Sequence, residues 1–361
     1  MARRVTRRGS RDVDRCVTGR VVHGVLVAVV AFVAFVTLTA TTVHAGEGDD
    51  FYPWHRPLDD SRAALNRRYN QVFTDALRDL NRGDRWRAMT CVDAAHEMTE
   101  RLFWTEYRFL LRVQPHFGLH YAPRTNTEDI EQYRPRSLYH DVPFWWVPLT
   151  VAPLERELRV GDVTFSTDKI AHFFPTGWRY WRVYRERRAV GDDDDTALRA
   201  AIDQIGVATE LGGWGLGIDG IFSFADLEAN YQGLVFFQRL CDPQRPDLVK
   251  TATGWALRRP FDFGEWVNPC WDESYYGNTY VDVIWPAIAH AMAEKCSLLA
   301  RPHVAAQRAR YRALGCTSPS VRILEEYVAA GHVPDPRPFD IETVCNNKGA
   351  AHGQPAHPVS R

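Results

Sequence analysis

Polar residues whose types and spacing suit chemistry gather in the middle of the chain. Asp168 and His172 are four residues apart, so on a helix their side chains would be neighbours on one face. Asp226 and Asn230 have the same spacing in a later helical segment, and Glu210 closes a helical segment between these two pairs. If the three helices pack together, one small volume receives an imidazole, up to three carboxylates and an amide.

Two interpretations of this cluster involve no chemical reaction. In the first, which we favour, the cluster is structural: buried polar groups satisfy one another and fix the helix register. Asp226 would then belong to a Ser-x-x-Asp variant of the capping box, at the start of its helix. In the second, His172 supplies nitrogen, and Asp168, Glu210 and Asp226 supply oxygen, to a divalent metal in a carboxylate-rich helical cage.

A third interpretation is acid/base chemistry on a bound ester or phosphate. His172 would transfer the proton, Asp168 or Glu210 would orient the imidazole, and Lys169 would stabilise negative charge. This chemistry requires His172 to lie within about one hydrogen bond plus one water of Asp168 or Glu210, at the floor of an open cleft. A structural cluster would instead be dry and sealed by side chains.

The same residues resemble a family pattern. The order Asp168-Lys169-x-x-His172-Phe173, Glu210, then Ser223-x-x-Asp226-Leu227-x-Ala229-Asn230-x-x-Gly233 is similar to that of the VanZ-like and YfiM-like bacterial envelope proteins. The resemblance covers residues 168–233 only, and it implies a helical envelope protein of poorly defined activity. Residues 178–185 carry an arginine on nearly every turn, so they cannot span a bilayer as a VanZ-like helix would. The resemblance therefore implies a shared polar cluster and neither a shared topology nor a resistance function.

The helix expected at residues 178–188 is both aromatic and basic. Trp178, Trp181 and Tyr184 alternate with arginines, among them Arg182 and Arg188. Such a helix suits a membrane surface, where rings lie among headgroups and guanidinium groups meet lipid phosphates. The alternative is an ordinary amphipathic helix whose rings pack in the core. A membrane surface or an envelope lipid is therefore one predicted partner.

A weaker constellation of ligand-type residues lies elsewhere in the chain. One helix would offer adjacent acid and histidine side chains, with three further histidines farther along: Asp93, His96, Glu97 and Glu100, then His116, His120 and His140. Exposed helices carry such pairs routinely, so a second metal site there is the less favoured interpretation.

The N-terminus predicts export. Seven arginines precede an apolar run at residues 21–36, and a softer stretch ends at Val43-His44-Ala45, where small or short residues suit a signal peptidase. We expect residues 1–45 to be a signal peptide cleaved after Ala45, with an uncleaved anchor as the alternative. Either arrangement places the remaining chain on the periplasmic or extracellular side of the membrane.

Charge and motifs exclude some partners. Without residues 1–45, the totals of 44 basic and 45 acidic residues fall to 37 and 43, a mildly acidic balance that argues against a nucleic-acid partner. The sequence has no phosphate-binding loop, no dinucleotide fingerprint after a strand and no Gly-x-Ser-x-Gly elbow, so we expect no nucleotide.

Six cysteines remain after the expected cleavage. An even number in an exported chain predicts disulfides, although six cysteines allow 15 pairings. We expect these bridges in the C-terminal half of the chain, with the pairing left open.

The hydrophobic period predicts a mainly α-helical fold, a multi-helix assembly with a minor β-hairpin and disulfide bonds. The expected helices cover residues 59–82, 86–113, 168–190, 197–211, 224–240, 281–299, 304–314 and 320–330. Pro175 is expected to kink or end its helix, residues 212–220 to form a flexible glycine-rich link, and Gly161-Asp162 to turn the hairpin.

These elements form one expected domain at residues 46–348, followed by a disordered tail at 349–361. The favoured function is an exported, envelope-associated protein with a buried polar cluster and no defined activity. The alternative is a hydrolase, metal-dependent or not, that acts on a lipid, a phosphoester or a cell-wall fragment.

Overall fold

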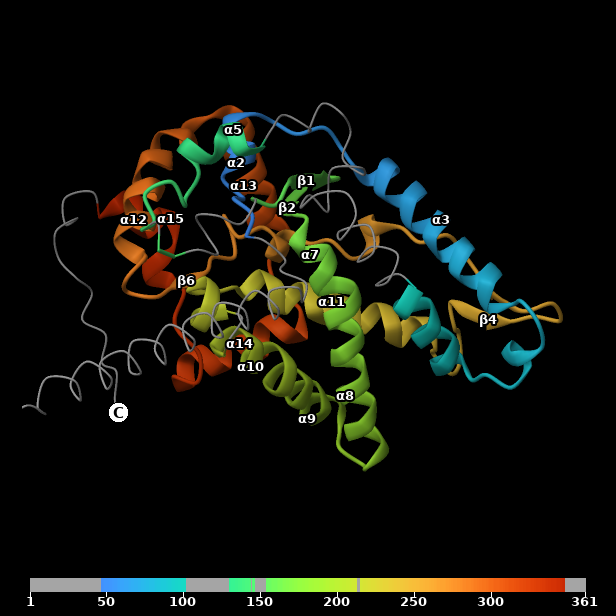
Figure 1. Ribbon diagram of the computed structural model, residues 1–361. Helices are drawn as coiled ribbons and strands as arrows, with labels where there is room; N and C mark the ends of the chain where they lie inside the picture. The colour runs from blue at the N-terminus through green and yellow to red at the C-terminus, as the bar shows by residue number, and fades with distance from the viewer. Residues whose placement is uncertain (1–46, 102–129, 144, 147–153, 213–214, 348–361) are drawn as a thin grey trace, which may run out of the picture. The chain divides into compact units, whose positions relative to one another are not determined.

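The computed structural model describes residues 47–101, 130–143, 145–146, 154–212 and 215–347 (Figure 1). The expected signal peptide and the tail at 349–361 lie outside these residues, as do His116 and His120. Most described residues are helical, and the strands are short antiparallel pairs. The mainly α-helical prediction is therefore confirmed.

Helices dominate the described chain, including the segments that carry the polar cluster. The longer ones are α3 (Arg62–Leu80), α8 (Gly177–Ala189), α9 (Asp194–Ala201), α11 (Phe224–Leu240), α12 (Trp285–Lys295), α13 (Pro302–Leu314) and α14 (Pro319–Ala330). Shorter ones are α2 (Tyr52–His55), α5 (Ile130–Tyr133), α7 (Asp168–Ala171), α10 (Ala208–Leu211) and α15 (Ile341–Asn346). Residues 91–101 are also helical. The helix expected at 86–113 starts later than predicted, because residues 86–90 belong to a short 3-10 turn, η1 (Arg85–Arg87), and the link after it, and residues 102–113 lie outside the described residues.

The predicted hairpin is present. Strand β1 (Glu157–Val160) pairs with β2 (Val163–Ser166), and Val160 faces Val163 across the turn. Gly161 takes a φ of 62°, a left-handed conformation that glycine adopts without steric cost. Two further strand pairs were not predicted: β3 (Ile221–Phe222) with β6 (Thr279–Tyr280), and β4 (Leu248–Lys250) with β5 (Trp255–Leu257).

The helical segment that starts at α7 continues past its proline. A π-helical turn, η4 (His172–Thr176), contains Pro175 and leads directly into α8. Proline lacks the backbone N–H that an α-helix would use, and the wider turn accommodates it. Figure 1 shows α7 and α8 following one another as a single column that α11 crosses.

The crossing of this column with α11 requires glycine. A Cβ atom on Gly233 would lie 1.9 Å from the carbonyl oxygen of Phe173, and one on Gly177 would lie 2.5 Å from the Cα of Gly233. Neither position has room for a side chain, so the two helices approach at backbone distance. This crossing brings His172 next to Asn230.

The glycine-rich link differs from the prediction. A helical run comprises α9, a π-helical segment η5 (Ile202–Val207), and α10. After it, residues 215–219 form a π-helical turn, η6 (Gly215–Asp219). The run begins at the predicted acidic stretch, where the side chain of Asp193 accepts a hydrogen bond from the backbone N–H of Thr196. The expected flexible link is therefore wrong for these five residues, because closely spaced glycines permit the tight helical path.

Two hydrophobic cores hold the described elements together. The larger one joins α3, α8 and α11, where aromatic rings such as Phe73, Phe173 and Phe236 contact one another. The smaller one joins α2, α12 and α15 around residues such as Trp54 and Ile288. No helix in the described ranges combines the length and apolarity that a membrane crossing needs.

Three disulfides link the six cysteines, as the even count predicted. They are Cys91–Cys241, Cys270–Cys316 and Cys296–Cys345. Two of them lie in the C-terminal half, but the first reaches back to the helix at residues 91–101. The expected restriction to the C-terminal half was therefore wrong for one bridge, because spatial proximity and not sequence distance sets the pairing.

Candidate functional site

The centre of the polar cluster is the ammonium group of Lys169, whose side chain is fully buried. Its Nζ lies 2.7 Å from Oδ2 of Asp168, 2.7 Å from Oδ1 of Asp226 and 2.6 Å from Oε1 of Glu273. Burial alone would lower the pKa of Lys169, but the surrounding carboxylates raise it well above its ordinary value. Lys169 is therefore a permanent cation that joins α7, α11 and the segment before β6.

His172 forms the outer edge of this cluster. Its Nε2 lies 3.1 Å from Oδ2 of Asp226, and its Nδ1 lies 3.2 Å from Oδ1 of Asn230. The side chain of His172 is 17% exposed, whereas those of Asp168 and Lys169 are 4% and 0% exposed. The imidazole is thus the most accessible of these groups, and both of its ring nitrogens have protein partners.

Glu210 enters the cluster through the start of α11. Its Oε2 accepts a hydrogen bond of 3.1 Å from the backbone N–H of Ser223. The hydroxyl of Ser223 in turn accepts from the backbone N–H of Asp226 and donates to Glu273 at 2.8 Å. Ser223 is therefore the N-cap of α11, but only half of the predicted capping box forms, because the backbone N–H of Ser223 donates to Glu210 and not to Asp226. Through Glu273, Ser223 also connects the start of α11 to Lys169.

Two carboxyl groups in this cluster have their pKa values moved in opposite directions. Burial, together with the charge of Asp226, raises the pKa of Glu210 well above its ordinary value. Burial would raise the pKa of Asp226 too, but His172 and Lys169 lower it below its ordinary value. At neutral pH, Glu210 is therefore the better proton donor and Asp226 the better anion.

Sequence reasoning missed several members of the cluster. Glu273 contacts Lys169 and also accepts from Asn278 Nδ2 at 2.7 Å, while the hydroxyl of Ser166 donates to Asp168. Glu47 is half-buried, and burial together with the charges of Glu273 and Asp219 raises its pKa. Glu273 follows a stretch rich in proline, tryptophan and tyrosine that has no helical period, so only the long-range contact reveals its role.

The excess of buried carboxyl groups makes stability depend on pH. Burial and the charge of Asp226 raise the pKa of Asp219 to about 7, and burial raises the pKa values of Glu47, Glu210 and Glu273. A group whose pKa is higher in the folded chain than in the unfolded chain stabilises the fold when protonated, and this stability is lost as the pH rises through the folded pKa.

We therefore expect the free energy of unfolding to rise as the pH falls from 8 to 6. Asp219 alone would contribute about 1.4 kcal/mol over this interval, and the melting temperature in the presence of a chelator measures it. The matched variant Asp219→Asn should lose that part of the pH dependence. At still lower pH the trend reverses. The pKa of Asp226 is lowered in the folded chain, so the stability that its ionised form contributes is lost when Asp226 is protonated. A melting temperature that is flat or falls from pH 8 to pH 6 would contradict this expectation.

Three of the predicted metal ligands come together. One ligand atom each from Asp168, His172 and Asp226 lies within 4.8 Å of the other two. Glu210, the fourth predicted ligand, is not part of this group, and its Oε2 is directed to the backbone of Ser223. The three-residue group is the arrangement among the described residues that could hold a divalent ion with one nitrogen and two oxygen ligands.

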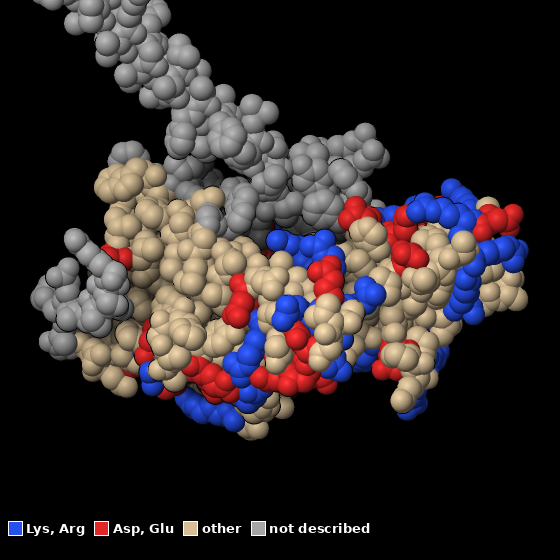
Figure 2. Space-filling view, turned by 90° about the horizontal axis from the view of Figure 1, so that it is seen from below, with Lys and Arg blue, Asp and Glu red and all other residues tan. Residues whose placement is uncertain are grey.

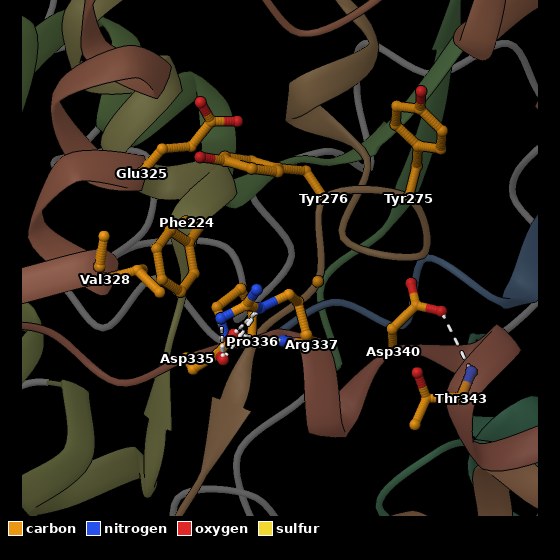
Figure 3. A pocket seen from close by; sticks show the side chains of 12 residues that line it. Phe224, Tyr275, Tyr276, Glu325, Val328, Asp335, Pro336, Arg337, Asp340 and Thr343 are labelled. Carbon is orange, nitrogen blue, oxygen red and sulfur yellow. Dashed lines mark hydrogen bonds and ion pairs between the residues drawn. The ribbon is translucent and has the colours of Figure 1, made fainter. Parts of the chain in front are cut away.

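A cavity of about 550 Å³ lies beside the segments that carry the cluster (Figure 3). Phe224, which follows Ser223, lines it, and so do Tyr275 and Tyr276, two and three residues after Glu273. None of its twelve lining residues belongs to the predicted cluster. Most side chains of the cluster are buried, as the structural interpretation requires. His172 also lies within 4.8 Å of Asp168, which meets the distance that the acid/base interpretation requires.

The aromatic rings of α8 pack inward. Trp181 is buried, and its ring contacts those of Trp178 and Phe237 at centroid distances of 5.1 and 6.0 Å. Tyr184 also packs against the larger core. The rings therefore favour the alternative that the sequence left open, a helix whose rings pack in the core, although Trp178 and Tyr184 are only half-buried.

Most arginines of α8 are exposed, and some of them pair with acidic side chains. Arg187 is 2.5 Å from Asp192, and Arg188 is 2.9 Å from Asp194. Figure 2 shows acidic and basic side chains interleaved over the face of the molecule seen from below. A membrane surface as partner stays a prediction, now carried by charge alone.

The second constellation does not gather into a metal site. Glu97 pairs with Arg85 at 2.6 Å, the ring of His96 stacks on Trp178 at 5.2 Å, and Asp93 accepts from the backbone N–H of Thr90 at 2.9 Å. His140 lies elsewhere, beside Asp141. Each described member has a local partner instead.

Comparisons of the chain with protein-family models, with curated proteins and with solved structures find no match. The resemblance of residues 168–233 to the VanZ-like and YfiM-like pattern therefore remains a prediction from the sequence. The function has to be argued from the geometry of the cluster.

Proposed function

We propose that this chain is an exported protein of the bacterial cell envelope that binds a divalent cation through Asp168, His172 and Asp226. The observation that carries the proposal is the mutual distance of at most 4.8 Å between their ligand atoms. Two ligand atoms on opposite sides of an ion lie about 4.0 to 4.8 Å apart when each is about 2.0 to 2.4 Å from it. The group therefore has the size of a coordination shell for one divalent ion.

The charge balance favours the same proposal. Three carboxyl groups surround the single ammonium group of Lys169, so the group carries an excess of negative charge whenever all three are ionised. An uncompensated buried charge is costly, so the group must take up protons or a cation. One divalent ion would neutralise the excess, and the partly exposed edge of His172 gives it a route from the solvent.

Export rests on two observations. The N-terminal segment has the arginine-rich and apolar pattern of a signal peptide. Three disulfides join the six described cysteines, and such bridges persist in oxidising compartments. The envelope assignment adds the resemblance of the central segment to bacterial envelope proteins.

Ion titration tests the proposal. The purified chain, freed of metal with a chelator, is titrated with Mg²⁺, Mn²⁺ and Zn²⁺ in a calorimeter. We expect one of these ions to bind at this site, and His172→Ala and Asp226→Asn to weaken that binding at least about tenfold. His332→Ala, which removes an exposed histidine of α14's C-terminal turn, is the control and should leave binding unchanged. Binding that survives both site variants, or no binding of any of the ions, would refute the proposal.

A second candidate function is hydrolysis of a phosphoester, a lipid ester or a cell-wall fragment at the same site. The observation that favours it is the position of His172, whose partly exposed imidazole lies 3.1 Å from Asp226 and within 4.8 Å of Asp168, so that a carboxylate can orient a proton-transferring histidine. A bound ion would supply an activated water molecule.

Activity measurements test this second candidate. The metal-loaded chain should release nitrophenol from p-nitrophenyl phosphate or from a p-nitrophenyl ester, and Asp226→Asn should reduce the rate at least about a hundredfold. Cell-wall fragments serve as the third substrate class, with product release followed by chromatography. A chain that binds its ion at the site and turns over none of the three would be a binding protein only.

A further inference from the structure

The cavity of about 550 Å³ is lined by helix α14, the turn before β6 and the segment that leads into α15 (Figure 3). Its volume is within the range of small-molecule sites, roughly 300 to 1,000 Å³. One face of α14 lines it with Glu325, Val328 and Ala329, which are three and four residues apart on successive turns. Phe224 and Tyr276 add two aromatic rings to the apolar part of the wall.

The aromatic part of the wall is held in place by the fold. The rings of Phe224 and Tyr276 contact one another at a centroid distance of 5.6 Å. Phe224 is buried and is the first residue of α11, directly after the N-cap Ser223. The backbone N–H of Tyr276 donates to the carbonyl oxygen of Asp272 at 2.8 Å. A ligand would therefore meet a wall that is already ordered, which removes part of the entropic cost of binding.

The charged groups of the lining leave an excess of negative charge. Asp335 and Arg337 neutralise one another through hydrogen bonds of 2.6 to 2.9 Å. Asp340 accepts a hydrogen bond of 2.6 Å from the backbone N–H of Glu342 and so caps α15. Within the described ranges neither Glu325 nor Asp340 forms an ion pair, so the wall presents two carboxylates that no side-chain cation neutralises.

The end of α14 makes this part of the wall more negative. Val328 and Ala329 lie in the last turn of the helix, whose carbonyl groups carry partial negative charge. Figure 3 also shows that the two carboxylates lie apart: Glu325 is beside the hydroxyl of Tyr276, and Asp340 is at the other side of the view. The cavity therefore offers two separate places for positive charge, together with an apolar surface.

We infer that this cavity binds a small organic amine, a ligand with one or two protonated amino groups on an apolar body. The ammonium groups pair with Glu325 and Asp340, and the apolar body packs on Phe224, Tyr276 and Val328. A cation within about 6 Å of an aromatic ring is also attracted to the face of that ring. An anionic ligand is disfavoured, because its charge has the same sign as the two carboxylates.

Calorimetric titration of the metal-free full chain with 1,5-diaminopentane and with 2-phenylethylamine tests this inference. We expect binding of one amine per chain, and no binding of the neutral 1,5-pentanediol or the anionic glutarate at the same concentration. The double variant Glu325→Gln with Asp340→Asn should weaken binding at least about tenfold, and asparagine still caps α15. Glu326→Gln is the matched control and should bind as the unchanged chain does, because this neighbouring carboxylate pairs with Arg199 and Arg322 outside the cavity.

A steric variant tests the place of binding. Ala329→Trp puts a large side chain into the cavity and should abolish amine binding, whereas Ala330→Trp, at an exposed position outside the lining, should not. His172→Ala should leave amine binding unchanged, so this inference and the divalent-cation proposal fail separately. Circular dichroism checks that each variant is folded. No binding of either amine, binding that survives the double variant or Ala329→Trp, or pentanediol bound as tightly as the diamine would overturn the inference.

Discussion

Replacement of Lys169 by methionine is expected to lower the free energy of unfolding by about 3 to 5 kcal/mol. The substitution keeps the length and apolar stem of the side chain but removes the cation that lies within 2.7 Å of three buried carboxylates. Those carboxylates would then repel one another in a site that excludes water. Urea unfolding at pH 7.5, followed by circular dichroism, measures the loss.

The loss should shrink at acidic pH, because protonated carboxyl groups no longer need the ammonium group. Lys250→Met is the matched control: this lysine is exposed and its ammonium group donates to the carbonyls of Arg87 and Met89. We expect the control to cost less than about 1 kcal/mol. Equal effects of the two substitutions, or a loss for Lys169→Met that is the same at pH 5 and pH 7.5, would contradict the buried-cation account.

Removal of the Cys91–Cys241 disulfide is expected to cost about 5 kcal/mol in the chain-entropy account of disulfide stabilisation. The bridge closes a loop of 150 residues, so it restricts the unfolded chain strongly. It also fastens the helix at residues 91–101 to the end of α11. The double variant Cys91→Ser with Cys241→Ser should therefore show a large fall in melting temperature under oxidising conditions.

The matched comparison is the pair Cys296→Ser with Cys345→Ser. Its bridge closes a loop of 49 residues, for which the same account gives about 4 kcal/mol. The two double variants should rank in the order of their loop lengths. If the longer loop contributes less, native contacts around the bridge and not chain entropy set its contribution.

Local patterns were sufficient to predict much of the fold. The period of apolar residues marked α3 and α14 nearly to their ends, because each buries one face against the larger core. It also marked α11, which is buried on most sides. The hairpin was predictable because Gly161 lies between two alternating runs. The glycine-rich turn η6 was not, because glycine signals both flexible links and tight turns, and only the surrounding contacts decide between them.

The candidate site was predictable only where its residues share a helix. Asp168 with His172 and Asp226 with Asn230 have helical spacing, and the structure brings both pairs to one place. Glu273 comes from a segment without periodicity, more than 100 residues beyond Lys169, so only the fold reveals it as the third carboxylate. The crossing at Gly177 and Gly233 is the tertiary event that assembles the rest.

The order of the cysteines along the chain affects how the protein must mature. Cys270 pairs with Cys316, and Cys296 pairs with Cys345, so the two closed loops interlock in sequence. Oxidation of cysteines in the order in which they are synthesised would join Cys270 to Cys296 and Cys316 to Cys345 instead. Correct maturation therefore requires either that folding of α12 and α13 precedes oxidation, or that a disulfide isomerase exchanges the early partners. In a host that lacks such an isomerase, the yield of correctly paired protein therefore depends on whether α12 and α13 fold before their cysteines are oxidised.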